Sequence, residues 1–270
     1  MFSTLKEIII ANFKNLATLW SLGLRALERQ RRDTIFGWFW LFAQPLIYVL
    51  AFGVALEVGI RQERNFESTR PYLLWLAGGV YPWFFIKWIF GDGRNIFKSQ
   101  SRLIKTNVLP MAAIPTVGLM PQLIVFLLTY VAMLLIAWPF GAPPTIYWLQ
   151  LPLIAALMIF FVYCFSLMVS CWSALSKDFA NVIKVLNTPI FWLSGIIFNI
   201  SGTTNKVLKA FLDINPVTFL VNAFRDSVYF DKWAFTSLHT LLPFLAVLLL
   251  TALMAWRNYH LLKSEVLDAL

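Results

Sequence analysis

The sequence predicts an all-α integral membrane protein with six transmembrane helices, an N-terminal amphipathic interfacial helix, and short re-entrant helices between spans 5 and 6. Of its 270 residues, 60% are hydrophobic and only 13% are charged, whereas soluble domains average about 45–50% apolar and about 25% charged residues. The charges lie in short clusters between long uncharged runs, as in the loops of membrane proteins. The whole chain, 1–270, is therefore predicted to form one transmembrane domain.

Six segments satisfy the requirement for about 20 mostly apolar residues per spanning helix. The run 34–56 carries no charge, and 72–90 is interrupted only by Lys87 near its end. The uncharged run 106–176 is long enough for two spans, and its FGAPPT sequence at 140–145 supplies a turn because tandem prolines break helices. The predicted spans are about 36–58, 72–90, 116–138, 146–175, 185–205 and 237–257.

The distribution of basic residues predicts the orientation. With the N-terminus inside, the inner segments hold fifteen of the 22 Lys and Arg residues, about twice as many as the outer segments. This bias predicts a multi-pass protein of the cytoplasmic membrane with both termini in the cytoplasm. The net charge of +9 does not indicate nucleic-acid binding, because the basic residues form no single basic face. Cys164 and Cys171 are expected to be small buried hydrophobes.

Residues 1–33 are predicted to form an interfacial helix. Apolar residues recur at helical spacing, and basic residues lie away from that stripe, as in helices that rest on the inner membrane surface. The polar face could dock a cytoplasmic partner or could be a solvated anchor. The stripe comprises Leu5, Ile8, Ile9, Phe13, Leu16, Leu19, Trp20 and Leu27.

Two connections between the predicted spans are too long to be simple turns. In the inner loop 91–115, basic residues recur every three to four positions, a spacing that puts them on one helical face: Arg94, Lys98, Arg102 and Lys105. They are either a positive-inside topology signal or part of a short helix that docks a soluble subunit. The outer stretch 199–233 is too broken to cross the membrane. Asn215 and Pro216 look like a helix start, so two short helices are expected to dip into the outer leaflet.

No motif for catalysis, metal binding or nucleotide binding is present. The sequence lacks GxxxxGK[ST], HExxH and Gly-x-Ser-x-Gly, and its two histidines belong to no metal-ligand pattern. The predicted spans also contain almost no acidic groups or histidines, which membrane enzymes and ion-coupled transporters usually need. We expect no catalytic centre, no metal and no cofactor in this chain, and a transport pathway powered by another protein.

The first and fifth predicted spans are rich in aromatic residues. For any one of them, lipid anchoring or helix packing is a sufficient explanation. As a set, they also suit a channel for sugars, whose C–H faces stack on aromatic rings. The predicted channel-lining residues are Trp38, Phe39, Phe42, Tyr48, Phe52, Phe191, Trp192 and Phe198.

The order of several motifs resembles ABC-2 type polysaccharide-export permeases. A basic cluster runs into FGWFW (36–40) and Pro45-Leu46, where the family has a Leu-Gly-aromatic-Leu-Trp…Pro-Leu pattern. GVYPWFF (79–85) is similar to the family's Gly…Pro-Trp-Phe-Phe, and SKDF (176–179) to its Arg-Asp turn. Asn215-Pro216 and Phe224-Arg225-Asp226 are similar to its Asn-Pro…Tyr-Arg-Asp. Residues 104–115 resemble its Ile-Lys-Lys…Pro…Pro segment.

This resemblance implies a homodimeric permease with two copies of a separate ABC ATPase, which would bind ATP and Mg²⁺. It implies that Arg94, Lys98, Arg102 and Lys105 couple to the ATPase. The outer gate would include Asn215, Pro216 and Arg225. The substrate would be a polymer on undecaprenyl diphosphate, and basic residues at the inner mouth could attract that diphosphate: Arg29, Arg31, Arg32 and Lys177.

Within the family, GIRQ (59–62) and TNVLPMAAIPT (106–116) look most similar to wall teichoic acid translocation permeases. An O-antigen or capsular polysaccharide exporter is the alternative. A drug or lipid exporter of the same class would be expected to have a longer insertion than residues 57–71. A membrane enzyme of envelope lipid metabolism is disfavoured by the missing acid and histidine groups.

Overall fold

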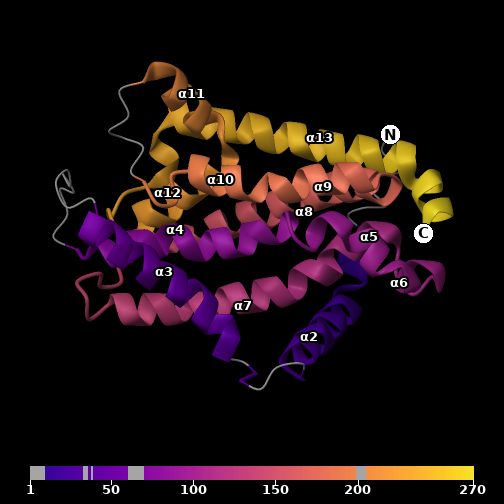
Figure 1. Ribbon diagram of the computed structural model, residues 1–270, viewed down its shortest axis with the longest axis horizontal. Coiled ribbons are helices and arrows are strands. Elements are labelled where there is room, and N and C mark those ends of the chain that lie inside the picture. The colour runs from indigo at the N-terminus through magenta and orange to yellow at the C-terminus, as the bar shows by residue number, and fades with distance from the viewer. Residues whose placement is uncertain (1–9, 33–35, 38, 60–69, 199–204) are drawn as a thin grey trace.

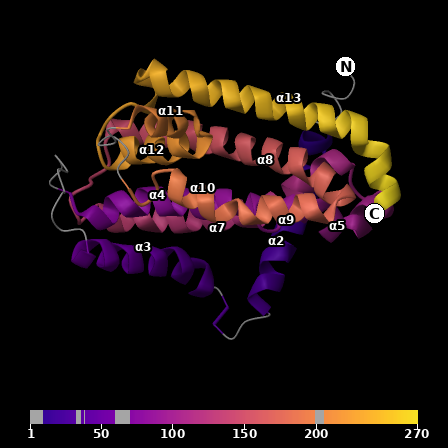
Figure 2. The same ribbon diagram turned by 45° about the horizontal axis from the view of Figure 1, so that its top comes forward.

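The computed structural model describes residues 10–32, 36–37, 39–59, 70–198 and 205–270, and all regular elements within these ranges are helical. Long helices run side by side along the longest axis of the molecule (Figure 1). Turned by 45°, the bundle has α13 along one side and α3 along the other (Figure 2). The longer helices are α2 (Leu16–Arg32), α3 (Phe39–Gly59), α4 (Tyr72–Ile86), α7 (Ile114–Ala137), α8 (Leu151–Leu175), α9 (Lys177–Val185), α10 (Asn187–Leu193), α11 (Lys206–Ile214), α12 (Pro216–Val228) and α13 (Leu238–Ala269).

Four helical segments of the described part are long and apolar enough to cross a membrane: Tyr72–Lys105, Met111–Ala137, Ile146–Leu175 and Leu238–Ala269. They correspond to the predicted second, third, fourth and sixth spans. The first predicted span coincides with α3, whose apolar part Phe42–Ala55 is shorter than this criterion requires. The multi-span helical fold is therefore present, whereas the count of six stays a prediction.

The predicted fifth span differs most from its expected bounds of 185–205. Helix α9 begins at Lys177, where the Ser176 hydroxyl accepts a hydrogen bond from the backbone N–H of Phe179. Helix α10, which follows it, ends at Leu193. The two helices α9 and α10 are separated at Leu186, because Pro189 has no N–H to donate to the carbonyl of Val185. Residues 199–204 of the expected span lie outside the described residues.

Helices α11 and α12 form a bent pair. Their axes meet at 78°, which fits either a broken span or a re-entrant loop. Asn215 caps α12 by accepting from the N–H of Val217, and Pro216 occupies the first turn, as the sequence predicts.

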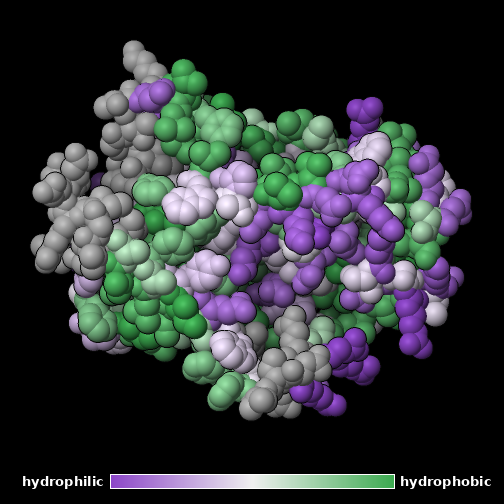
Figure 3. All heavy atoms as spheres, viewed as in Figure 1, coloured by the Kyte–Doolittle hydropathy of each residue, from purple (hydrophilic) through white to green (hydrophobic). Residues whose placement is uncertain are grey.

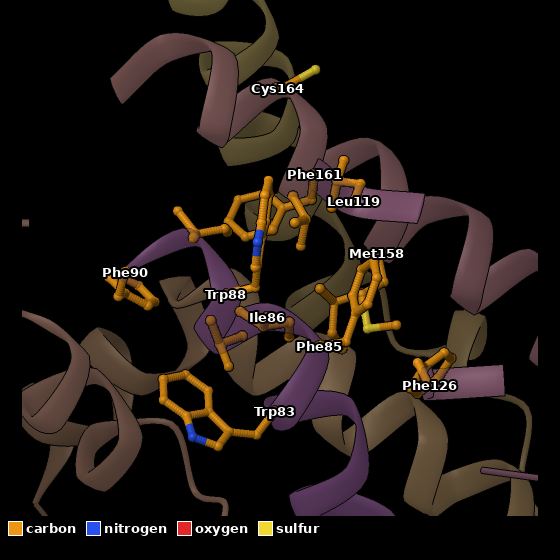
Figure 4. Close-up of a cluster of buried hydrophobic side chains, with 14 of the residues drawn as sticks. Trp83, Phe85, Ile86, Trp88, Phe90, Leu119, Phe126, Met158, Phe161 and Cys164 are labelled. Carbon is orange, nitrogen blue, oxygen red and sulfur yellow. The ribbon is translucent and has the colours of Figure 1, made fainter. Parts of the chain in front are cut away.

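The core is centred on the end of α4 and the short helices that follow it: η1 (Lys87–Ile89), η2 (Gly93–Asn95), α5 (Ile96–Ser99) and α6 (Ser101–Lys105). Trp88 points toward Phe161 of α8, and Phe85 lies beside Met158 (Figure 4). The same buried cluster includes Ile86 of α4 and Leu119 and Phe126 of α7. Gly118 permits the close approach of Trp88, since a Cβ there would lie 2.6 Å from Trp88 Cζ2. Apolar packing thus holds together segments that are distant in sequence.

Helix α2 packs across α7, inclined to the long helices (Figure 1). The approach is close at Gly23, where an added Cβ would lie 2.5 Å from Met120 Cβ. Leu19 and Leu27 are buried in this contact, whereas other members of the predicted stripe, Phe13, Leu16 and Trp20, are exposed. The predicted apolar stripe is therefore divided between the bundle and the surface, and its contact with the membrane stays a prediction.

Candidate functional site

Aromatic side chains connect α3 to α10, the helices of the first and fifth predicted spans. The Phe52 ring lies 5.7 Å from that of Phe191 and 6.3 Å from that of Trp192, centroid to centroid. The row continues from Phe52 to Tyr48 at 5.9 Å and from Trp192 to Phe198 at 5.7 Å. We call Tyr48, Phe52, Phe191, Trp192 and Phe198 the aromatic row. The structure thus brings together residues that are about 140 positions apart in the sequence.

Most predicted channel-lining rings are accessible. Phe39, Phe42, Tyr48, Trp192 and Phe198 are exposed, Phe52 is half-buried, and Phe191 is buried with 8% exposure. Phe39 and Phe42 lie on the same helix, α3, and the Phe39 ring contacts those of Phe36 and Trp40. Trp38 lies outside the described residues. Every member of the aromatic row except Phe191 therefore has a ring that is at least partly accessible.

Two aromatic residues of α4 join the row and were not predicted as site residues. Trp83 contacts Phe191 at 5.5 Å, and Phe84 contacts Tyr48 edge-on at 5.1 Å. Both belong to the GVYPWFF motif, so the sequence carried a signal for them. Only the packing of α4 between α3 and α10 gives them this position.

The predicted contacts for the carrier diphosphate are distributed over two helices. Arg29 and Arg32 are exposed at the end of α2, where Arg32 lies 3.9 Å from Glu28. Lys177 is exposed at the start of α9, which packs on α8 rather than on α2. Arg31 is helical, but its side chain is outside the description. A diphosphate site formed by all four residues stays a prediction.

The four predicted coupling residues do not share one helical face. The chain leaves helical geometry at Gln100 (φ −109°, ψ 20°), so α5 and α6 are separate short helices. Arg94 donates back to the carbonyls of Phe90 and Gly91, and Lys98 donates to the carbonyl of Ser173 at 2.8 Å. Lys105 donates to the carbonyl of Leu270, and Arg102 is exposed. Hydrophilic residues gather on the surface at this end of the molecule (Figure 3). The expectation of a single basic face was wrong, because spacing alone does not reveal a helix break.

Arg225, predicted as a gate residue, is buried with 1% exposure. Its guanidinium donates to the carbonyls of Trp75 (3.0 Å), Gly195 (2.7 Å) and Ile196 (2.5 Å), and stacks 3.5 Å from the Trp75 ring. These contacts join α12 to α4 and to the turn after α10. Because a buried guanidinium needs acceptors for its donors, Arg225 fixes the relative position of three segments.

Asn215 reinforces the same connection. Its side-chain amide donates to the hydroxyl of Ser194 at 2.8 Å and to the carbonyl of Leu193 at 3.3 Å. The bend between α11 and α12 is therefore attached to the end of α10, the helix that carries Phe191 and Trp192. A displacement of α10 would be transmitted directly to the predicted gate helices.

A second polar cluster, unpredicted from sequence, lies at the same end of the bundle. Arg70 pairs with Asp231 at 2.5 Å and donates to the carbonyls of Gly141 and Val228. Thr145 donates to the other oxygen of Asp231 at 3.1 Å. These bonds join the residues before α4, the turn between α7 and α8, and the segment after α12. The short-range sequence signal for this cluster was absent, because its members are up to 161 positions apart.

At the opposite end, Asn12 attaches the N-terminal segment to the bundle. Its amide donates to the Tyr163 hydroxyl at 3.0 Å, and its carbonyl oxygen accepts from Thr116. Tyr163 in turn donates to the carbonyl of Ala112 at 2.8 Å. This network connects the helical segment before α2 to α8 and to the start of α7. These hydrogen bonds therefore connect the N-terminal segment to both α7 and α8.

The candidate site combines exposed aromatic rings with polar contacts that join neighbouring helices. Among the described residues, no group of three His, Cys, Asp or Glu side chains could hold a metal ion. Instead, exposed aromatic rings lie beside helices that polar contacts join mechanically. With four helical segments of its described part long and apolar enough to cross a membrane, the chain is a multi-span helical membrane protein in its general class.

Comparison with known proteins identifies the family. Residues 17–229 match the ABC-2 type transporter family, so the chain belongs to that family and is the membrane subunit of a transporter. It is 21% identical to the O-antigen export system permease protein RfbA of Myxococcus xanthus, over 91% of both chains. It is 22% identical to the protein of the same name from Klebsiella pneumoniae, over 74% of this chain and 75% of that one.

Proposed function

We propose that this chain is one of two identical transmembrane subunits of an ABC exporter for a cell-surface polymer linked to undecaprenyl diphosphate. Two copies of a separate ATPase would bind ATP and Mg²⁺ and supply the energy, while this chain would bind no cofactor. The complex would lie in the cytoplasmic membrane, with both termini of this chain in the cytoplasm. Family membership supports the ATPase partnership, and the names of the relatives support the polymer as substrate.

The observation that carries the proposal is the aromatic row between α3 and α10. Aromatic faces attract the C–H faces of sugars and hold no fixed charge that would trap a moving polymer. The attachment of α10 to α12 through Arg225 and Asn215 supports a gating role for the bent pair. Closure of the ATPases would then shift α3 and α10 and open the gate.

Two polymers are candidates. The relatives are O-antigen permeases, which favours export of an O-antigen or capsular polysaccharide. The residues of 59–62 and 106–116 favour wall teichoic acid. We propose polymer export as the common function and teichoic acid as the first substrate to test, because both stretches lie beside predicted spans rather than in remote loops.

Reconstitution tests the proposal. The full chain would be co-expressed with an ABC ATPase from the same organism, purified, and placed in proteoliposomes with lipid-linked teichoic acid or lipid-linked O-antigen. We expect a stable complex and ATP-dependent export of one of the two polymers. If no ATPase co-purifies and neither polymer moves with ATP, the proposal is wrong. If the complex exported O-antigen in preference to teichoic acid, it would still be a polymer exporter, but its substrate would be O-antigen.

The coupling residues can be tested in the same complex. Replacing Lys98, Arg102 and Lys105 together with alanine is expected to lower polymer-stimulated ATPase activity severalfold without preventing insertion, because these residues are exposed. A matched control is Lys209→Ala combined with Lys263→Ala, which changes exposed or half-buried lysines on α11 and α13. Unchanged activity in the triple variant would remove this loop from the docking surface.

A further inference from the structure

A pocket of about 360 Å³ lies between α3, α4 and α7, apart from the residues predicted from sequence. It lies beside the start of α3, the end of α4 and the middle of α7. Trp40, Phe84 and Phe126 give it apolar walls. A volume in the range of about 300–1,000 Å³ with a few convergent polar groups is typical of small-ligand sites.

Four polar side chains from different segments line this pocket: Gln44, Lys87, Asp92 and Gln122. Within the described ranges, none of these four side chains makes a hydrogen bond or an ion pair. By contrast, the Thr129 hydroxyl in the same wall donates to the carbonyl of Val125 at 2.8 Å. The amides, ammonium and carboxylate therefore keep their hydrogen-bonding capacity for a ligand.

The charges of the pocket select among ligands. The Lys87 ammonium lies 3.4 Å from the centre of the Phe84 ring, and Asp92 supplies one carboxylate, so the lining is neutral in sum. A phosphate or diphosphate would be repelled by Asp92 and would find only one cation. A neutral molecule rich in hydroxyls could instead use both amides and both charged groups, since each can bond a hydroxyl.

The aromatic side chains of the pocket further restrict the class of ligand. Trp40 is 41% exposed and lines the pocket, while Phe84 belongs both to the pocket and to the contact with Tyr48. The pocket is thus continuous with the aromatic row. A ring with hydroxyls at its edge and C–H groups on its face matches polar side chains beside an indole.

We propose that this pocket is a saccharide-binding subsite that holds one neutral sugar ring of the exported polymer beside the aromatic row. Gln44 and Gln122 would bond its hydroxyls from opposite helices, and Trp40 would stack on its face. This inference rests on the proposed function and adds to it a defined position within a single subunit. It differs from the predicted diphosphate contacts, which lie on α2 and α9.

Binding can be measured without transport. The full chain in lipid nanodiscs would be titrated with N-acetylglucosamine and with its β-1,4-linked disaccharide, using saturation-transfer NMR. Gln44→Met combined with Gln122→Met keeps the side-chain length but removes both amides. We expect at least tenfold weaker sugar binding, since two hydrogen bonds are lost. Gln100→Met, at a glutamine that lies outside the pocket and is half-buried like Gln122, is expected to leave binding within twofold.

Trp40→Leu provides a second variant. If this variant still assembles into nanodiscs but no longer binds the sugar, the result would support stacking of the Trp40 ring on the sugar. Equal binding by the double variant, by Trp40→Leu and by the unmodified chain would overturn the subsite. A second result would also overturn the subsite. If sodium diphosphate displaced the sugar from the unmodified chain but not from Lys87→Met, the pocket would prefer an anion. Sugar binding without ATP-driven export would contradict the proposed function alone, and export without sugar binding would contradict this subsite alone.

Discussion

Two buried or half-buried cations of this protein, Arg225 and Lys87, illustrate opposite uses of charge within an apolar fold. Arg225 donates to carbonyls on two other segments and has almost no exposed surface. Lys87 lines a pocket and lies over an aromatic ring, with no hydrogen bond or ion pair among the described residues. A fully bonded charge holds the fold together, whereas one without polar partners is available to a ligand.

The largest expected effect comes from removing the bonded cation. Arg225→Met should destabilise the folded chain by roughly 3 kcal/mol or more, because three buried carbonyls lose their donor. The apparent melting temperature in detergent measures this loss. Arg257→Met is the control, since Arg257 is exposed and its removal uncovers no buried acceptor. Equal melting temperatures for the two variants would refute the structural role of Arg225.

The glycine next to Arg225 offers a sharper test of the same region. A Cβ on Gly79 would lie 2.4 Å from Arg225 Nη2, whereas a Cβ on Gly91 meets nothing closer than 3.6 Å. Gly79→Ala should therefore cost about 1–3 kcal/mol through overpacking, and Gly91→Ala should cost far less. The melting temperatures of the two variants measure this difference. The packing around Arg225 would have to be looser than described if Gly79→Ala melted like Gly91→Ala.

Asp231 tests the second polar cluster at this end. Asp231→Ala removes the partner of Arg70 and the acceptor for Thr145, and we expect a loss of roughly 1–2 kcal/mol because the pair is largely shielded from water. Asp231→Asn should lose less, since asparagine keeps an acceptor and tolerates the φ of 50° at this position. A ranking in which asparagine is as damaging as alanine would argue against this explanation.

The smallest effect on stability is expected in the aromatic row. Phe52→Leu keeps most of the apolar volume and removes ring contacts with Phe191 and Trp192, a change of about 0.5–1.5 kcal/mol. Its effect on export should be larger than its effect on melting temperature. Leu123→Ile on α7, outside the row, is the matched control. Export and stability that change in proportion would indicate that the row only packs helices.

The predicted helices followed from composition because long uncharged runs have no other stable arrangement in a membrane. The helix start at Asn215-Pro216 was also accessible, since capping depends on adjacent residues. The bounds of α9 and α10 were missed. The charged sequence Lys177-Asp178 suggested a loop, but Ser176 caps a helix there.

The sequence predicted several residues of the candidate site but not the contacts between them. Aromatic enrichment indicated the helices of the row, and the GVYPWFF motif contained Trp83 and Phe84. The role of Arg225 could not be deduced, because its acceptors are backbone carbonyls, which every residue possesses. The pocket was also inaccessible, since Gln44, Lys87 and Gln122 lie on separate helices and belong to no local pattern.

By itself, the sequence determined that this chain is a helical membrane protein without catalytic or nucleotide-binding motifs, because hydropathy and short motifs depend on neighbouring residues. The tertiary structure decided which charges are bonded and which remain available. That distinction depends on contacts between residues as far apart as Trp75 and Arg225, or Arg70 and Asp231. Only the folded chain brings a donor to its acceptor, and so only the folded chain separates the arginine that holds α12 in place from the lysine that faces a pocket.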